Sequence, residues 1–283
     1  METLEKIQQS VPRWRGAPLD SNYPLLIWAN DGLGDTIQFS RYIPWVSKLV
    51  EKIYFLVPGN VFETWTNPTD PVPSLKPLFK DYERYVEAIL IKGWDELPEC
   101  SYQIDVMQLV TIFHHIPEAP LFHIPPDSQI NKLFSKDQTN VALATRGSLA
   151  FPDDENRSIP DEDIAGEIDH LLSLPINLWD IHLEPRPWSV NCKRVTVEEN
   201  NILTLANIIR NCNLVISVDT MIAHLAGSLG IPIWMLHPRS PRTRWAFQTT
   251  TPWYPSMRIF DYEGSWKKTL QTITETLKYG GMV

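Results

Sequence analysis

Short apolar runs alternate with helical stretches along most of this chain, and this alternation constrains its fold more than any other feature. The runs are rich in valine, isoleucine and leucine, and each predicts a buried strand. Strands that alternate with helices are typical of parallel α/β domains. Nine strands are expected, at residues 25–29, 52–57, 87–91, 102–107, 140–145, 176–182, 213–218, 231–236 and 257–261.

The alternation is interrupted at residues 116–138, which contain several prolines followed by a polar run. Such a segment indicates a boundary between domains. The sequence therefore predicts two Rossmann-like domains, at residues 1–135 and 136–283. At 283 residues the chain is long enough for each domain to bury its own core.

Composition excludes several classes of protein. Hydrophobic residues make up 43% of the chain, which excludes a disordered protein. The net charge of −9 argues against nucleic acid or an anionic membrane as the main partner. No apolar run approaches the ~20 residues that span a bilayer, and no signal peptide is recognisable. Cys100, Cys192 and Cys212 are odd in number and widely spaced, so reduced thiols and a cytoplasmic location are expected.

A polar turn follows the predicted strand 213–218 and leads into a short helix that ends near Gly230. We expect Asp219 to cap this helix, so that the N–H groups of residues 220–222 point out of its N-terminus. Such an end attracts anions, because its donors are unpaired and the helix dipole is positive there. His224 lies one turn further on. It either adds a ring N–H to the anion site or is a satisfied, half-buried histidine.

A glycine turn follows the first predicted strand. Gly32 and Gly34 permit a tight turn and the close approach of a ligand to the backbone. Ile37 stands where the dinucleotide fingerprint has its third glycine, which argues against NAD binding. What remains is Asp35, a carboxylate at the mouth of the turn. Apolar residues then recur at helical spacing, with Pro44 expected to kink the helix.

These two turns lie in segments 12–44 and 215–255, which resemble the heptosyltransferase-related glycosyltransferases of family 9. The resemblance is strongest to the glycosyltransferase domain found behind tetratricopeptide repeats in bacterial proteins, which residues 156–160 also fit. It covers nearly the whole chain in order. It implies the GT-B fold, an α/β architecture in which two Rossmann-like domains face each other across a cleft. The first domain then binds the acceptor and the second binds the nucleotide-sugar donor.

The resemblance implies an inverting, metal-independent transfer of a sugar from a nucleotide diphosphate to an acceptor hydroxyl, with no cofactor besides the donor itself. Asp35 matches the general base proposed for the heptosyltransferases. Arg157 matches a basic residue that contacts the donor phosphates, a task that suits the rigid fork of a guanidinium. Trp245 follows in a late loop, where its ring either stacks on a base or sugar or simply packs. The expected substrate-binding residues are Gly32, Gly34, Gln38, Arg157, Asp219, Thr220, Met221, Ile222, His224, Arg244 and Trp245.

The chain departs from the family pattern at three places. Asn30-Asp31 replaces a Glu-Gln pair, Arg242-Thr243 replaces an Asp-Trp pair, and Met221 replaces a smaller residue. The base of the donor therefore stays open among ADP, GDP and UDP. The acceptor stays open among a glycan, a lipid-linked sugar and a protein.

Two other functions remain alternatives: a binding or scaffold protein with the GT-B shape but no turnover, and a nucleotide-sugar epimerase. The acidic triplet at residues 161–163 looks like a metal motif, but it begins a predicted helix, where acidic side chains favour the dipole. His114, His115 and His123 have no ligands at metal-binding spacing, so no metal site is expected. An apolar stripe in the last helix predicts burial against the domain. Its members are Trp266, Leu270, Ile273 and Leu277.

Overall fold

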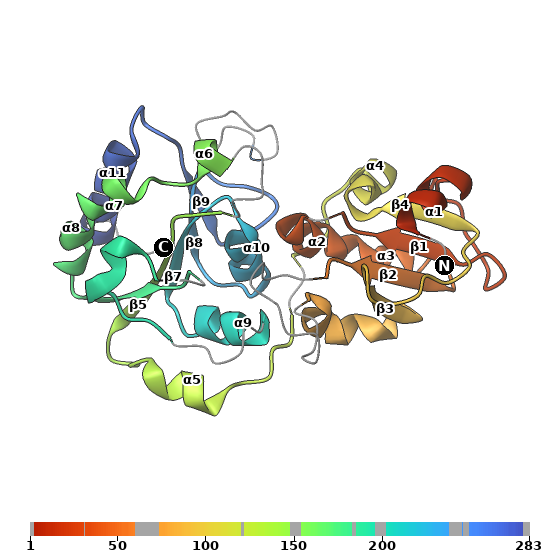
Figure 1. Ribbon diagram of the computed structural model, residues 1–283, viewed down its shortest axis with the longest axis horizontal. Helices are drawn as coiled ribbons and strands as arrows, with labels where there is room; N and C mark the ends of the chain where they lie inside the picture. Colours follow the sequence, from red (N-terminus) through yellow and green to blue (C-terminus); the bar gives the residue numbers. More distant parts are fainter. Residues whose placement is uncertain are drawn as a thin grey trace. The chain divides into compact units, whose positions relative to one another are not determined.

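The computed structural model describes residues 3–30, 32–59, 74–119, 122–147, 154–182, 185–195, 202–237, 245 and 249–279. The chain divides into two compact units, one of Met1–Ile124 with Asn200–Leu203 and one of Pro125–Glu199 with Thr204–Val283. Each unit contains one parallel sheet surrounded by helices (Figure 1). The division after Ile124 falls within the proline-containing stretch 116–138.

The sheet of the first unit has the strand order β3-β2-β1-β4, and every pair in it is parallel. Because the strands are parallel, their carboxyl ends lie at one edge of the sheet, where ligands of such folds bind. β1 and β4 are neighbours, so the residues that follow them come close together. The strands are β1 (Leu25–Trp28), β2 (Ile53–Val57), β3 (Ala88–Ile91) and β4 (Tyr102–Asp105).

Both faces of this first sheet are covered. Ile7 of the N-terminal helix packs against Leu26 and Leu56. Phe55, which points to the opposite face from Leu56, meets Phe79 with ring centroids 5.2 Å apart. Each fully buried side chain of this size stabilises the fold by roughly 1.5–3 kcal/mol. The helices are α1 (Leu4–Ser10), α2 (Leu33–Phe39), η1 (Ser40–Tyr42), α3 (Ile43–Val46), η2 (Lys76–Arg84), η3 (Val106–Leu109) and α4 (Val110–Phe113).

The sheet of the second unit has the order β6-β5-β7-β8-β9 and is also parallel throughout. Its central strand β7 is buried along its whole length, as expected for a strand covered on both faces. The strands are β5 (Thr139–Ala144), β6 (Ile176–Asp180), β7 (Leu214–Val218), β8 (Ile233–Leu236) and β9 (Met257–Phe260). All nine predicted strands are therefore confirmed, with ends that differ by at most two residues.

One layer of helices in this unit packs its apolar side chains into the main core. Ile164, Leu171 and Trp266 belong to the same buried cluster as strand residues Val141 and Ile216. The helices are α5 (Ser128–Leu133), α6 (Asp154–Arg157), α7 (Asp161–Ala165), α8 (Ile168–Leu172), η4 (Pro187–Asn191), α9 (Ile202–Arg210), α10 (Met221–Ser228) and α11 (Trp266–Tyr279). The helices α9 and α10 lie apart from α7, α8 and α11 in Figure 1. The predicted burial of the stripe in the last helix is confirmed, since Trp266, Leu270 and Ile273 are fully buried.

Local details near the sites differ from the expectations. Pro44 does not kink one long helix. It stands in the first turn of a separate helix, α3, because its fixed φ suits a helix start, and η1 bridges the two helices. The acidic triplet does occupy the first turn of α7.

No helix in the described part of the chain is long and apolar enough to cross a membrane. The three cysteines are all free, and Cys212 is buried.

Candidate functional site

The turn between β7 and α10 is the first of two candidate sites, and it lies in the second unit. Strand residues up to Asp219 are buried, and so are helix residues from Ala223 onward. Residues 220–222 between them are partly exposed. The N-terminus of α10 is therefore the accessible part of this motif, as an anion site at a helix end requires. Gly230 follows the helix with a φ of +71°, which confirms it as the stop signal.

The N-cap of this helix is not the residue that the sequence predicted. Thr220 is the N-cap, and its hydroxyl accepts a hydrogen bond from the N–H of Ile222 at 3.3 Å. The predicted cap, Asp219, is engaged elsewhere, because its Oδ2 accepts a hydrogen bond from the indole Nε1 of Trp245 at 3.1 Å. The cap already uses the N–H of Ile222, which leaves the start of the helix with fewer donors for a ligand than the sequence suggested.

His224 is almost fully buried behind this turn. Its Nδ1 lies 3.1 Å from the hydroxyl of Tyr254, and its Nε2 lies 3.8 Å from Oδ1 of Asp219. The ring also packs beside Trp245, with centroids 5.7 Å apart. Trp245 is only 1% exposed, so its ring is packed in the protein rather than presented as an open face. These buried side chains pack against one another behind the N-terminus of α10. Arg244 lies outside the described residues.

Arg157 comes to the same place from a distant part of the sequence. Its Nη1 donates to the backbone carbonyl of Asp219 at 3.2 Å, and its Nε donates to Oδ1 of Asp154 at 2.9 Å. A Cβ at position 147 would collide with the guanidinium, so Gly147 makes room for it. The structure thus joins a partly exposed, oriented guanidinium to the helix end that the sequence singled out.

Ser158 does not cap the helix that follows Arg157. Pro160 occupies the N-cap position of α7 and makes no side-chain cap. The hydroxyl of Ser158 instead donates to Oδ2 of Asp154 at 2.8 Å and accepts from the N–H of Gly147 at 2.9 Å. Asp154 therefore orients the guanidinium of Arg157, and the hydroxyl of Ser158 holds the carboxylate of Asp154 in place.

The second candidate site is the glycine turn of the first unit. Gly32 is the N-cap of α2, and Asp35 stands in the first turn of this helix. A Cβ at position 32 would lie 2.6 Å from Oδ2 of Asp35, so the glycine lets the carboxylate fold back toward the helix N-terminus. Asp35 is partly exposed, as a base that meets a substrate must be.

Asp105 is a second carboxylate at this turn that the sequence analysis missed. It ends β4, beside β1, and its Oδ1 accepts a hydrogen bond from the N–H of Met107 at 2.8 Å. Burial raises the pKa of Asp105, and the negative charge of Asp35 raises it further. The signal for Asp105 was its position after an apolar strand that neighbours β1.

Gln38 and Gly34 continue the same helix. Gln38 is fully buried, and its amide nitrogen and oxygen have no hydrogen-bond partner within the described ranges. Gly34 is partly exposed in the first turn. The structure therefore groups Gly32, Gly34 and Asp35 at the helix start and places Gln38 deeper in the unit.

A second polar cluster that the sequence analysis did not identify lies at the carboxyl ends of β5 and β6. Nδ1 of His182 lies 2.5 Å from Oδ1 of Asp180, and its Nε2 accepts the N–H of Thr145 at 2.9 Å. Arg194 donates to Oδ2 of Asp180 at 2.8 Å. Burial would raise the pKa of Asp180, but the hydrogen bonds and charge of His182 outweigh it, and the pKa falls to about 2. This network connects the end of β6 to the residue that follows β5, next to Arg146 and Gly147.

Within the described residues, no group of three His, Cys, Asp or Glu side chains is arranged to hold a metal ion.

The fold resembles solved structures of glycosyltransferases. No protein-family model matches the sequence, and no curated protein matches it. A family 9 glycosyl transferase from Veillonella parvula superposes with a TM-score of 0.53 at 12% identity, over 96% of this chain and 94% of that one. The ADP-heptose lipopolysaccharide heptosyltransferase II of E. coli gives a TM-score of 0.57 at 12% identity, over 90% and 97%.

Two further structures share this fold. TibC of enterotoxigenic E. coli, an iron-containing dodecameric glycosyltransferase, gives a TM-score of 0.57 at 15% identity, over 89% of this chain and 66% of that one. A protein of Listeria monocytogenes assigned as a UDP-N-acetylglucosamine 2-epimerase gives 0.50 at 9% identity, over 94% and 89%. The chain therefore has the two-domain, Rossmann-like α/β fold of the family 9 glycosyltransferases, which confirms the predicted fold class.

Proposed function

We propose that this chain is a glycosyltransferase that moves a sugar from a nucleotide diphosphate to an acceptor hydroxyl. The observation that carries the proposal is the meeting of Arg157 with the N-terminus of α10, in a chain with the fold of family 9. A guanidinium and a helix end are both suited to phosphate oxygens. Asp35, on the glycine turn of the other unit, is the proposed catalytic group.

In the proposed reaction Asp35 removes the proton of the acceptor hydroxyl as its oxygen attacks the anomeric carbon of the donor. The bond from that carbon to the diphosphate oxygen breaks, and the diphosphate leaves with the electron pair. One displacement of this kind inverts the configuration. Negative charge grows on the leaving diphosphate, where Arg157 and the N–H groups of Thr220 and Met221 stabilise it. We propose that these groups suffice without a divalent cation.

The nucleotide is proposed to be ADP in the first instance, because the heptosyltransferase of E. coli with this fold is named for ADP-heptose. GDP and UDP remain candidates, because the chain departs from the family pattern in the late loop and at Met221. The acceptor is proposed to be a glycan, free or carried by a lipid or protein.

The test is to incubate the protein with ADP-, GDP- and UDP-sugars, with EDTA and with added magnesium or iron, and to follow the nucleotide by chromatography. A transferase releases nucleoside diphosphate, slowly to water and faster with an acceptor. Release that persists in EDTA supports the metal-independent mechanism, and release that requires a metal contradicts it. The anomeric configuration of the product, read by NMR, tests inversion.

The same experiment tests two alternatives. The likeness to the Listeria protein favours an epimerase as second candidate. An epimerase changes the sugar and needs no acceptor, whereas a scaffold protein binds nucleotide and releases nothing.

A further inference from the structure

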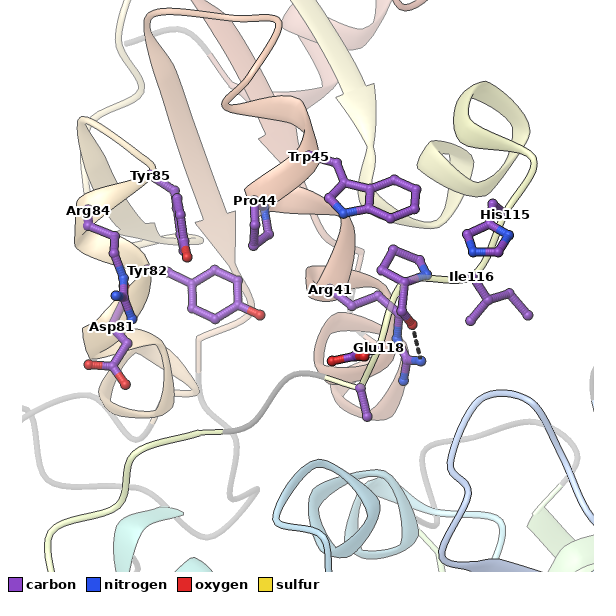
Figure 2. Close-up of a pocket in the computed structure, with 12 residues that line it drawn as sticks. Arg41, Pro44, Trp45, Asp81, Tyr82, Arg84, Tyr85, His115, Ile116 and Glu118 are labelled. Carbon is purple, nitrogen blue, oxygen red and sulfur yellow. Dashed lines mark hydrogen bonds between the residues drawn. The ribbon is translucent and has the colours of Figure 1, made fainter.

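The first unit contains a cavity of about 530 Å³ that neither candidate site uses (Figure 2). It is partly open to the surface and is lined by η1, the start of α3, the end of η2 and the segment 115–119 after α4, all within the first unit. This volume falls in the range of small-molecule sites, which combine apolar walls with a few oriented polar groups.

Four of the twelve residues that line the cavity carry aromatic rings. Trp45 and His115 stand on one side with parallel rings, 5.8 Å between centroids. Tyr82 of η2 and Tyr85, which directly follows η2, stand on the other side, with centroids 5.9 Å apart and rings nearly perpendicular. Figure 2 shows the two tyrosines across the cavity from Trp45, with Pro44 between them. Aromatic faces of this kind pack against the C–H faces of a ring-shaped ligand.

The polar groups of the cavity are held in place. Arg41 is 3% exposed, and its Nε donates to the carbonyl of Gln38 at 2.7 Å while its Nη1 donates to the carbonyl of Pro117 at 3.3 Å. Tyr82 is buried, and burial raises its pKa to about 12, so its hydroxyl stays protonated. An oriented guanidinium and a neutral phenol are hydrogen-bonding groups suited to hydroxyls.

The charges that line the cavity balance. Arg41 and Arg84 contribute two positive charges, and Asp81 and Glu118 contribute two negative ones. A site for phosphate or carboxylate would need an excess of positive charge, because the two carboxylates repel an anion. A lining with aromatic faces, fixed donors, carboxylate acceptors and no net charge matches a neutral ring with several hydroxyls.

We propose that this cavity binds a neutral sugar ring of the acceptor. The inference rests on the proposed function, which makes the acceptor a glycan. Arg41 follows Asp35 by six positions through α2 and η1, which is roughly 9–10 Å along a helix axis. The bound ring is therefore a sugar of the acceptor other than the one whose hydroxyl reacts, and the cavity selects an acceptor of more than one sugar.

The experiment measures sugar binding to the full chain in the absence of any nucleotide sugar, by saturation-transfer NMR. The neutral probes are the methyl glycosides of glucose, galactose, mannose and N-acetylglucosamine. The charged probes are glucose 6-phosphate and glucuronic acid. At least one neutral glycoside is expected to bind, and Tyr85→Ala is expected to weaken it about tenfold through loss of the stacking face.

The controls separate the cavity from general effects. Tyr85→Phe keeps the ring and is expected to keep binding. Tyr23→Ala and Trp94→Ala remove exposed aromatic side chains of the same unit outside the cavity. Neither substitution is expected to change the binding of the glycoside. Circular dichroism confirms that each variant is folded.

Three results would overturn the inference: no neutral glycoside binds, a charged probe binds more tightly than all neutral ones, or Tyr23→Ala weakens binding as much as Tyr85→Ala. Because no donor is present, these failures are distinct from a failure of the proposed function. That failure would appear as no release of nucleoside diphosphate from any nucleotide sugar.

Discussion

The two candidate sites differ in the kind of neighbour that their side chains have. In the second unit, Asp219 is bound by Trp245, His224 faces Tyr254, and Arg157 is held by Asp154. In the first unit, Asp35 stays partly exposed at a glycine turn beside a second carboxylate, Asp105. A rigid set of dipoles and charges is suited to hold a ligand without reorganising. A partly exposed carboxylate is within reach of the hydroxyl of a substrate.

We therefore propose a division of roles between the units, in which the second binds the nucleotide and the first supplies the catalytic group. If it holds, substitutions in the first unit change turnover and leave nucleotide affinity intact, while substitutions in the second change affinity.

The largest expected effect is that of Asp35→Asn. Removal of a general base lowers the rate on the order of 10²–10⁴-fold, while nucleotide affinity should stay within error of the wild type. Product release followed by chromatography gives the rate, and calorimetry gives the affinity. Asp95→Asn, an exposed aspartate of the same unit, is the control. Equal activity of the Asp35 variant would remove Asp35 from the mechanism.

The next effect is that of Arg157→Ala on nucleoside diphosphate affinity. Loss of one charge-assisted hydrogen bond costs about 1.5–3 kcal/mol, which raises the dissociation constant roughly 10- to 150-fold. Calorimetry in EDTA measures it. Arg258→Ala is the matched control, because Arg258 is exposed on β9, where it covers the Phe260 ring. A dissociation constant unchanged by Arg157→Ala would place the phosphates elsewhere.

The Asp180 network predicts an acid-sensitive component of the stability of the second unit. The folded pKa of about 2 lies below the ordinary value of 3.8, so the ionised carboxylate stabilises the fold above about pH 4. This contribution, about 2 kcal/mol, is lost as the pH falls from 4 through 2.

Denaturant unfolding at a series of pH values checks the sign. Asp180→Asn should flatten the acid limb of the curve, whereas Glu83→Gln, in an exposed ion pair with Lys80, should leave it unchanged. A wild-type stability that does not fall between pH 4 and 2 would contradict the role of Asp180.

The smallest effects come from one glycine in each unit. Gly32→Ala pushes on the carboxylate of Asp35, and Gly147→Ala pushes on the guanidinium of Arg157. Forcing a side chain away from its rotamer costs about 0.5–1.5 kcal/mol, or roughly 2- to 12-fold. Gly32→Ala should lower turnover alone, and Gly147→Ala should lower nucleotide affinity alone. The reverse pattern would break the division between the units.

The sequence was sufficient for the strands because their apolar, β-branched runs are bounded by glycines, prolines and polar turns. It was also sufficient for the end of α10, since Gly230 has the positive φ that a helix stop favours. Such signals act over a few residues and need no tertiary partner.

The cap of α10 shows where this reasoning ends. Asp219 and Thr220 are both good N-cap residues, and the choice between them is made by Trp245, which binds Asp219 from 26 positions away. Asp105 and the pair Asp180–His182 were missed for the same reason. Their roles come from strands that are neighbours in a sheet and not in the chain.

The order of the strands along the chain has a consequence for how the protein is made. The first sheet is complete at Asp105, whereas the last strand of the second sheet ends 155 residues later, at Phe260. At ribosomal rates of about 5–20 residues per second, this interval is roughly 10 to 30 s. Parallel α/β domains fold faster than that. We therefore expect the unit with Asp35 to fold during translation, while the second unit forms only once its edge strand has left the ribosome.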